Sequence, residues 1–453
     1  MPLKPETRLQ LKTFFNALND RVLDPALQAD RAVYVEEVND GKLSKSDPIE
    51  AIATGIDFQE GGSVHLFSGQ RGTGKSTELK RLKAKLEKWD MVAFYADLSE
   101  YILLTKPIEI SDFLISMAGA LSDAIAHEER FQGRLSPAYR GYWERFKDFL
   151  QTEVQVKEVG IKAVAGLDIK AELKNSPEFK EQVQKAARGY VNQIVRDAHA
   201  YFSDAVAQVR QALGKPDVKV VLIVDSVERI RGVGTDDMQV FESVRNLFFA
   251  HAEHLRIPGL HVVYTVPPYL SVLSGATGAL MGGVAVRSLV STHIFKDRSR
   301  DTDAEGLAVM RKVIEKRFSA WPEVFQEAAL NRLALSSGGD LREFFRLIRL
   351  CLTGVSDDAE LPLAEADVKA AENTVRNELL PIPADHLTWL ARVSKTHDTC
   401  LASEQDLPVL ARFLDNRLVL NYRNGTDWYD IHPLIRDVVE AHDGATQLTK
   451  PAA

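Results

Sequence analysis

The chain has 453 residues, of which 45% are hydrophobic and 26% charged, a mixture typical of globular proteins with room for two or three cores. A net charge of −8 argues against a protein whose main task is to neutralise a nucleic-acid backbone. The cysteines Cys351 and Cys400 have no metal-ligand spacing and suggest no disulfide framework, and residues 1–12 lack the apolar core of a signal peptide, so we expect a cytoplasmic protein.

Strands and helices are predicted to alternate through the first 300 residues. A helix opens at Asp47-Pro48, a short apolar strand (VHLFSG) follows at 64–69, and an amphipathic helix begins near Lys75. Further strands are predicted at 91–98, 218–225, 260–266 and 291–297, with helices between most of them. This order predicts an α/β fold with a parallel sheet and right-handed crossovers.

Two segments of this region interrupt the alternation. Residues 130–185 form an insertion, in which alternating apolar residues at 154–157 and 167–171 predict a half-exposed hairpin. Residues 269–286 carry no charge over 18 positions, the lower length limit for a membrane-spanning helix. Four glycines and a preceding proline pair favour a glycine-rich apolar loop instead, so we expect no membrane partner.

Helices replace strands beyond about residue 300. Apolar periodicity predicts lid helices at 309–318 and 342–352. A last unit begins near Pro381 and continues with helices at 386–393 and 407–414, then a hairpin around Asn424-Gly425 with arms at 417–423 and 427–432. Two helices followed by a hairpin describe a winged helix.

The segment 69–76 (GQRGTGKS) fits the P-loop pattern at every fixed position, between a predicted strand and a predicted helix. Glycines let successive backbone N–H groups point at phosphate oxygens, and the helix adds its positive N-terminal end. Lys75, facing solvent, would reach the β and γ phosphates of ATP, and the Ser76 hydroxyl would coordinate Mg²⁺. The predicted nucleotide-binding residues are Gly69, Gln70, Arg71, Gly72, Thr73, Gly74, Lys75, Ser76 and Thr77.

A second acidic motif follows the strand 218–225. Mg²⁺ bound to ATP needs a carboxylate at the C-terminal end of a neighbouring strand, and Asp225 is the residue that meets this requirement. Many P-loop ATPases carry glutamate directly after this aspartate, but here the position is Ser226. Glu228 is the next carboxylate, and we predict that it is the general base; the alternative is a solvated acid paired with Arg229 or Arg231.

These motifs together resemble those of the AAA+ superfamily of P-loop ATPases. Thr265, at the end of the strand 260–266, looks like the family's γ-phosphate sensor, and Arg342 in 337–345 (SGGDLREFF) is similar to the arginine of its second sensor. The resemblance therefore implies catalytic roles for Lys75, Asp225, Glu228, Thr265 and Arg342.

The order of lid and winged helix resembles origin-recognition AAA+ proteins and STAND signalling ATPases. Residues 225–228 (DSVE) look closer to the NACHT branch of STAND proteins, and 432–439 (HPLIRDVV) to bacterial STAND-like proteins. The resemblance covers about residues 30–440. The insertion and the missing adjacent glutamate depart from ordinary AAA+ motors. Arg287 and Arg298 are candidates for an arginine finger, but a surface charge is the favoured interpretation of each.

The predicted organisation has four parts: an N-terminal helical linker at 1–60, a P-loop ATPase core at 61–300, a helical lid at 301–380 and a winged helix at 381–445. We expect an ATPase that binds ATP and Mg²⁺, hydrolyses ATP slowly, and acts as a molecular switch controlling assembly or a partner protein. The resemblance implies a place in bacterial defence or stress signalling.

The alternative function is a DNA-binding initiator or loader. Residues 403–417, the recognition helix and its flank, carry a net charge of −1, and the wing tip offers only Arg423. Helices that read DNA present several basic or amide residues, so this charge favours a protein partner, a separately encoded effector or a nucleotide-dependent homo-oligomer over nucleic acid. A third candidate, a P-loop kinase, would not need the lid and the winged helix.

Overall fold

The structure of the protein is a computed structural model that describes residues 4–39, 42, 46–152, 169–187, 189–232, 236–273, 285–356 and 359–448. Compactness divides the chain into two units. The sheet unit comprises residues 49–68 and 79–287, and the lid unit comprises residues 1–48, 69–78 and 288–453. The P-loop thus belongs to the lid unit, and each unit is described in turn.

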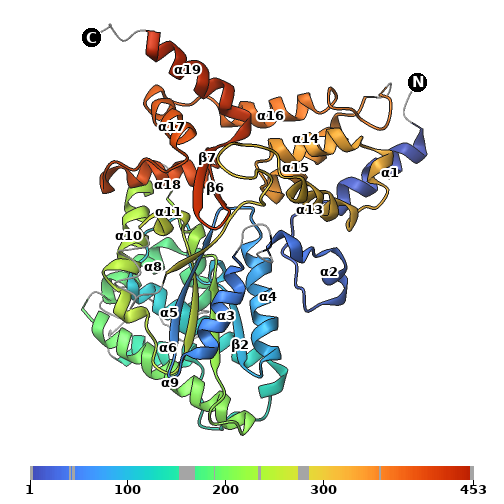
Figure 1. Ribbon diagram of the computed structural model, residues 1–453. Coiled ribbons are helices and arrows are strands. Elements are labelled where there is room, and N and C mark those ends of the chain that lie inside the picture. Colours follow the sequence, from blue (N-terminus) through green and yellow to red (C-terminus); the bar gives the residue numbers. More distant parts are fainter. Residues whose placement is uncertain are drawn as a thin grey trace. The chain divides into compact units, whose positions relative to one another are not determined.

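The sheet unit is built on a five-stranded sheet with the strand order β2-β3-β4-β1-β5 (Figure 1). The pairs β1–β4, β2–β3 and β3–β4 are parallel, which confirms the predicted α/β fold with a parallel P-loop sheet. All six residues of β3 are buried, as the unbroken apolar run VVLIVD requires of a strand covered on both faces. The strands are β1 (Ser63–Gly69), β2 (Val92–Asp97), β3 (Val220–Asp225), β4 (His261–Val266) and β5 (Val286–Leu289).

The helices of this unit cover the sheet and carry the insertion. α5 packs on β2 and against α9, and its residues are buried along most of their length. α9 ends at Gly214, whose φ of 64° lets its N–H bond back to Arg210 and Gln211. The helices are α3 (Pro48–Phe58), α4 (Lys75–Lys88), α5 (Ile110–His127), α6 (Tyr142–Thr152), α7 (Ile169–Asn175), α8 (Pro177–Ala187), α9 (Val191–Leu213), α10 (Asp237–Phe249) and α11 (Pro268–Val272).

The structure of this unit differs from two predictions. The second arm of the predicted hairpin, 167–171, is wrong, because Ile169–Ala171 begin helix α7; the first arm, 154–157, lies outside the described residues. Over so few residues, an alternating pattern also fits a helix with one face buried. Asp225 does not end a strand next to β1, because β4 lies between β3 and β1.

The last strand of the sheet is β5 rather than the predicted 291–297. In that predicted segment, the Ser291 N–H bonds the carbonyl of Asn421, and the Thr292 N–H bonds that of Gly339. Its backbone is therefore used by the hairpin and the lid loop rather than by the sheet. Arg287, predicted to precede the last strand, lies within β5 with its side chain exposed.

The lid unit contains the helices that precede and follow the sheet unit in sequence. The predicted lid helices are confirmed, and so are the two helices and the hairpin of the predicted winged helix, which a further helix follows. These elements are α1 (Pro5–Ala17), α2 (Gln28–Val33), α13 (Ala304–Glu315), α14 (Glu327–Ser336), α15 (Leu341–Gly354), α16 (Lys369–Leu379), α17 (Ala384–Thr396), α18 (Leu407–Asp415), β6 (Val419–Arg423), β7 (Asp427–Ile431) and α19 (Arg436–Leu448). We call residues 384–448 the C-terminal module.

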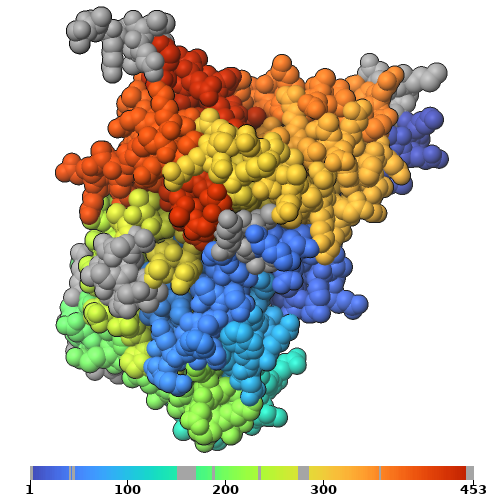
Figure 2. Space-filling model, in the orientation of Figure 1, coloured from blue at the N-terminus to red at the C-terminus, as the bar shows by residue number. Residues whose placement is uncertain are grey.

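One hydrophobic core joins α1, the lid helices and the hairpin of the C-terminal module. Phe14 of α1 stacks on Phe318 with 4.4 Å between ring centroids, and Tyr422 of β6 stacks on Trp428 of β7 at 4.5 Å. Figure 2 shows the lid helices (yellow to orange) and the hairpin (red) as one continuous body. The hairpin is therefore packed on the lid, while the boundaries of the four predicted parts stay predictions.

A buried ion cluster also holds the C-terminal module to the rest of the lid unit. Asp430, with 0% of its surface exposed, accepts hydrogen bonds from Arg300 at 2.6 and 2.7 Å and from Arg436 at 3.0 Å. Removing Arg300, the member of this cluster that lies outside the module, would leave the buried charge of Asp430 less compensated and should be destabilising.

Candidate nucleotide site

The P-loop has the backbone geometry that phosphate binding requires. It follows β1 directly, and α4 begins at Lys75. Gly72 and Gly74 have φ values of 102° and 94°, in the region where side chains other than glycine's are strained. The Thr73 hydroxyl donates to the carbonyl of Gln70 at 2.9 Å and fixes the turn between them. The loop is thus pre-shaped for an anion at the start of α4.

The prediction that Lys75 faces solvent is wrong. Its side chain is 6% exposed, and its Nζ donates to the carbonyls of Gly69 at 2.7 Å and Gln70 at 3.0 Å. These carbonyls stand in for phosphate oxygens as acceptors, so the ammonium stays paired within the loop. A phosphate must therefore compete with the loop for Lys75.

Gln70 links the P-loop to the C-terminal module. Its Nε2 donates to the carbonyls of Leu414 at 3.0 Å and Val419 at 2.6 Å, and its Oε1 accepts from the N–H of Asn421 at 3.0 Å. The residue is 2% exposed, so these bonds are shielded from water. The sequence placed Gln70 in the nucleotide site but gave no sign of these partners, which are backbone groups more than 340 positions away.

The N-terminal segment lies against the start of α4. The Thr77 hydroxyl accepts from the N–H of Leu23 at 3.1 Å, and Glu78 accepts from Tyr34 at 2.9 Å and Asn39 at 3.2 Å. Arg71 and Ser76, at exposed and half-buried positions, stay predicted nucleotide ligands, and so does Thr77.

Asp225 lies at the C-terminal end of β3 with 1% of its surface exposed. The Tyr95 hydroxyl donates to Asp225 Oδ2 at 2.5 Å, and the Ser226 N–H donates to Oδ1 at 2.7 Å. Tyr95 comes from the neighbouring strand β2, two residues before Asp97, which pairs with Asp225 in the sheet. The sequence analysis missed Tyr95, because which strand lies next to β3 becomes known only when the sheet is formed.

Thr265 lies beside the end of β1. Sheet register pairs it with Phe67, and it is fully buried. Its hydroxyl accepts from the Val227 N–H at 3.0 Å and lies 3.4 Å from the Val224 carbonyl. Thr265 therefore fixes the turn that follows β3, where Ser226 has a φ of 71°.

Glu228 belongs to this same turn, the short helix Val227–Arg229, and is half-buried. The hydrogen bond from the Val227 N–H to Thr265 ties the turn to β4 just before Glu228. The role of Glu228 as general base stays a prediction, and so does the sensor role of Thr265.

Arg342 pairs with the N-terminal segment. Its Nε lies 3.1 Å from Asp20 Oδ2, and its side chain is 37% exposed. The residue of the same motif that lies against the P-loop is Asp340: a Cβ on Gly72 would lie 2.5 Å from Asp340 Oδ2. The sensor role of Arg342 stays a prediction, and a phosphate would have to draw it from Asp20.

Two buried acids lie at the start of α15: Asp340 is its N-cap residue, and Glu343 belongs to its first turn. Both are 1% exposed, and burial is the largest cause that raises the pKa of each, while the nearby Arg417 lowers it. Arg417 Nη1 lies 2.6 Å from Glu343 Oε2 and 3.7 Å from Asp340 Oδ1. Nothing in the sequence marks these three residues as a cluster.

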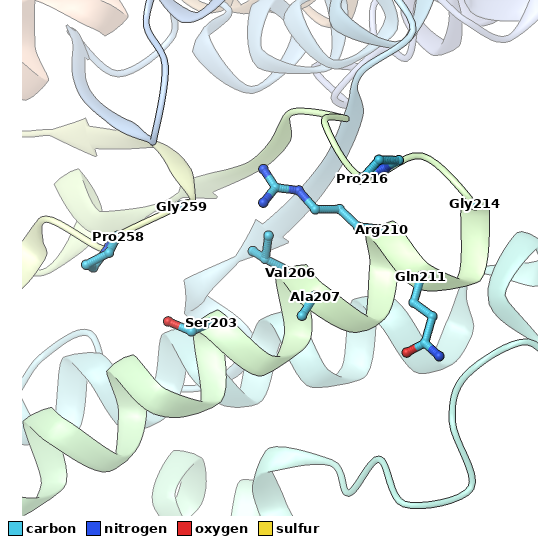
Figure 3. A pocket seen from close by; sticks show the side chains of 9 residues that line it. All are labelled: Ser203, Val206, Ala207, Arg210, Gln211, Gly214, Pro216, Pro258 and Gly259. Carbon is cyan, nitrogen blue, oxygen red and sulfur yellow. The ribbon is translucent and has the colours of Figure 1, made fainter.

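The sheet unit contains an open hollow that does not belong to this site. It has a volume of about 800 Å³ and lies between the C-terminal half of α9 and the residues before β4 (Figure 3). Arg210 lines it and donates to the carbonyl of Val218 at 3.0 Å. Because Gly259 precedes β4, the hollow lies near the N-terminal ends of the parallel strands, whereas such sheets bind ligands at the C-terminal ends.

No described group of three or more histidine, cysteine or acidic residues could hold a metal ion. The described helices include none that is long and apolar enough to cross a membrane. Ser76 and Asp225 offer the hard oxygen ligands that Mg²⁺ prefers, and both stay predicted ligands.

Comparisons with known proteins give structural neighbours. No family model and no curated relative matches the chain. The ORC2 protein of Aeropyrum pernix, solved with ADPNP and ADP, covers 96% of this chain and 98% of its own, with 11% identity and a TM-score of 0.38. The Walker-type ATPase PABY2304 of Pyrococcus abyssi covers 94% of this chain and 99% of its own, with 12% identity and a TM-score of 0.43. The ORC1 protein of A. pernix, solved in complex with DNA, covers 92% of this chain and 97% of its own, with 12% identity and a TM-score of 0.34.

These neighbours are origin-recognition proteins and a Walker-type ATPase. Identities and TM-scores this low assign no residue role. Each role therefore rests on the geometry of this chain.

Proposed function

We propose that the protein is a nucleotide-driven P-loop ATPase of the AAA+ kind, in which ATP at residues 69–77 controls the C-terminal module. The observation that carries this proposal is the bonding of Gln70. A residue of the phosphate-binding loop itself holds the backbone of α18 and β6 through three buried hydrogen bonds.

Nucleotide binding would act on this link through the loop. Phosphate oxygens attract the backbone N–H groups of the loop and the ammonium of Lys75. When Lys75 turns to phosphate, the carbonyls of Gly69 and Gln70 each lose the ammonium as a donor, and the Gln70 carbonyl keeps the Thr73 hydroxyl. Gln70 then changes its backbone environment while its side chain still holds Leu414 and Asn421, so the shape of the loop and the position of the module are coupled.

Hydrolysis is proposed to be slow. No carboxylate follows Asp225 directly, so Glu228 or a group from another subunit must orient the attacking water. A misplacement of about 1 Å can cost on the order of a hundredfold in rate. We therefore expect turnover well below the ~1–100 s⁻¹ typical of kinases. Mg²⁺, held with Asp225 and Ser76, would neutralise the phosphates.

The experiment compares the wild-type chain with Lys75→Ala. Calorimetric titration with ATP-Mg²⁺ should give binding in the wild type and none in the variant, and hydrogen exchange of residues 414–421 should change on ATP binding only in the wild type. ATP binding that Lys75→Ala leaves unchanged would remove the P-loop assignment. ATP binding without any change at 414–421 would refute the coupling.

The output of the switch has two candidates. A protein partner, an effector encoded separately or a second copy of the chain, is favoured by the charge of residues 403–417 and by the pairing of Arg423, which bonds Asp427 and the carbonyl of Ser288. DNA is the second candidate, because one neighbour, the A. pernix ORC1 protein, was solved in complex with DNA. Mass measurement with ATP or ADP, with and without duplex DNA, distinguishes an oligomer from a DNA complex.

A further inference from the structure

Two buried carboxylates lie where a polyphosphate is proposed to bind. Asp340 caps α15, accepting the N–H of Glu343 at 2.8 Å, and its other oxygen, Oδ2, is buried and has no hydrogen-bond partner among the residues that the structure describes. A Cβ on Gly72 would lie 2.5 and 2.6 Å from the two Asp340 oxygens, so the carboxylate touches the P-loop. Glu343 follows one turn later. Negative charges in a buried position repel a phosphate, and the repulsion is strong where water is excluded.

Arg417 neutralises these acids. It lies between α18 and β6 in a left-handed conformation, with a φ of 60°, and its Nη1 lies 2.6 Å from Glu343 Oε2 and 3.7 Å from Asp340 Oδ1. The side chain is 23% exposed, so the guanidinium keeps access to solvent.

The P-loop fixes the backbone on both sides of Arg417. Gln70 bonds Leu414, three residues before it, and Val419 and Asn421, which follow it. Two independent links, one through Gln70 and one through Asp340 on Gly72, therefore hold this arginine of the C-terminal module beside the phosphate-binding loop.

We propose that Arg417 is a phosphate ligand supplied by the C-terminal module, and that Asp340 and Glu343 hold its guanidinium until a nucleotide binds. The proposal deepens the proposed function and rests on it. When phosphate arrives, the guanidinium exchanges a carboxylate for phosphate oxygens, which match the same planar fork of donors. Glu343 keeps a counter-ion, because Arg346 Nη1 lies 3.6 Å from its Oε1. The position of the module then depends on the phosphate directly, in addition to the link through Gln70.

The acids and the arginine give opposite predictions. Arg417→Gln should weaken ATP binding about ten- to a hundredfold, because a charge-assisted contact is lost while the acids remain. Glu343→Gln should tighten ATP binding several-fold, because the amide has the same shape but neither holds the guanidinium as strongly nor repels phosphate. If Arg417 only held α18 to α15, neither variant would tighten binding.

The experiment is calorimetric titration of the full chain with ATP-Mg²⁺, with circular dichroism to confirm folding. The matched control is Arg412→Gln, an exposed arginine on α18 of the same module, which should bind as the wild type does. Arg417→Lys keeps the charge without the fork and should bind ATP more tightly than Arg417→Gln. If Arg417→Gln does not fold, Arg417→Lys and Glu343→Gln still decide the matter.

Unchanged affinity in a folded Arg417→Gln variant, or weaker binding in Glu343→Gln, would overturn the proposal. Its failure is distinct from that of the proposed function. If the wild type binds ATP, Lys75→Ala does not, and the Arg417 and Glu343 variants match the wild type, only the role of Arg417 falls. If the wild type binds no ATP, the proposed function itself falls.

Discussion

Replacing Gln70 with alanine would remove the link between the P-loop and the C-terminal module. The side chain makes three buried hydrogen bonds, and each buried polar group left without a partner costs about 1–3 kcal/mol. The carbonyl of Leu414 also accepts from the N–H of Arg417 at 3.3 Å, so this carbonyl would keep one hydrogen bond in the variant. We therefore expect Gln70→Ala to destabilise the lid unit by about 2–4 kcal/mol rather than by the full sum of three penalties.

Gln70→Glu gives a sharper form of the same prediction. A carboxylate has nearly the same shape, but in place of Nε2 it would direct an oxygen at two carbonyl oxygens, Leu414 and Val419, in a buried position. It should therefore cost more than alanine does, although it retains an acceptor for the N–H of Asn421.

Urea denaturation followed by tryptophan fluorescence provides the assay, since Trp389 and Trp428 are buried in the C-terminal module. Hydrogen exchange should show faster exchange of the Asn421 amide in Gln70→Ala. Thr426→Ala, an exposed position at the hairpin turn, is the control and should change stability by less than about 0.5 kcal/mol. If Gln70→Ala changes the free energy of unfolding as little as this control does and the Asn421 amide stays protected, the link contributes no stability and the proposed coupling is wrong.

Three further predictions concern catalysis and pH. Arg342→Ala should lower ATP affinity or turnover about ten- to a hundredfold, because the arginine is expected to leave Asp20 for a phosphate. If a titration and a turnover assay give the same affinity and rate for the variant as for the wild type, Arg342 does not belong to the site. Glu228→Gln should trap bound ATP and lower an already slow phosphate release, whereas an unchanged, fast rate would contradict both its role as base and the slow switch. Burial lowers the pKa of His65 and His261 to about 4, so the unfolded chain binds more protons between pH 6.5 and 4. Their contribution to stability is complete above pH 6.5 and is lost as the pH falls toward 4, by up to about 2 kcal/mol for each at pH 5; thermal unfolding should show this decline, and a pH-independent midpoint would contradict it.

The sequence by itself determined the features that neighbouring residues specify. The P-loop is one contiguous pattern, and its glycines Gly72 and Gly74 adopt positive φ angles. The hairpin around Asn424-Gly425 and the buried strand at 220–225 also formed as predicted, because turn chemistry and an unbroken apolar run act over a few residues. Short ambiguous patterns failed: Ile169–Ala171 became helix, and in the segment 291–297 the N–H groups of Ser291 and Thr292 bond the carbonyls of Asn421 and Gly339 instead of the sheet.

Only the tertiary structure decided which distant groups meet at the phosphate-binding loop. Gln70 and Asn421 are 351 positions apart, and no local rule pairs a glutamine side chain with a particular backbone amide. Asp340 lies against Gly72, and Tyr95 bonds Asp225, because packing of the lid and the strand order of the sheet bring them together. A short-range pattern records the preferences of each residue for its neighbours along the chain, whereas such contacts depend on how whole elements pack. The sequence could therefore identify the loop that is proposed to bind phosphate, and folding determined that Arg417 lies beside the acids that contact this loop.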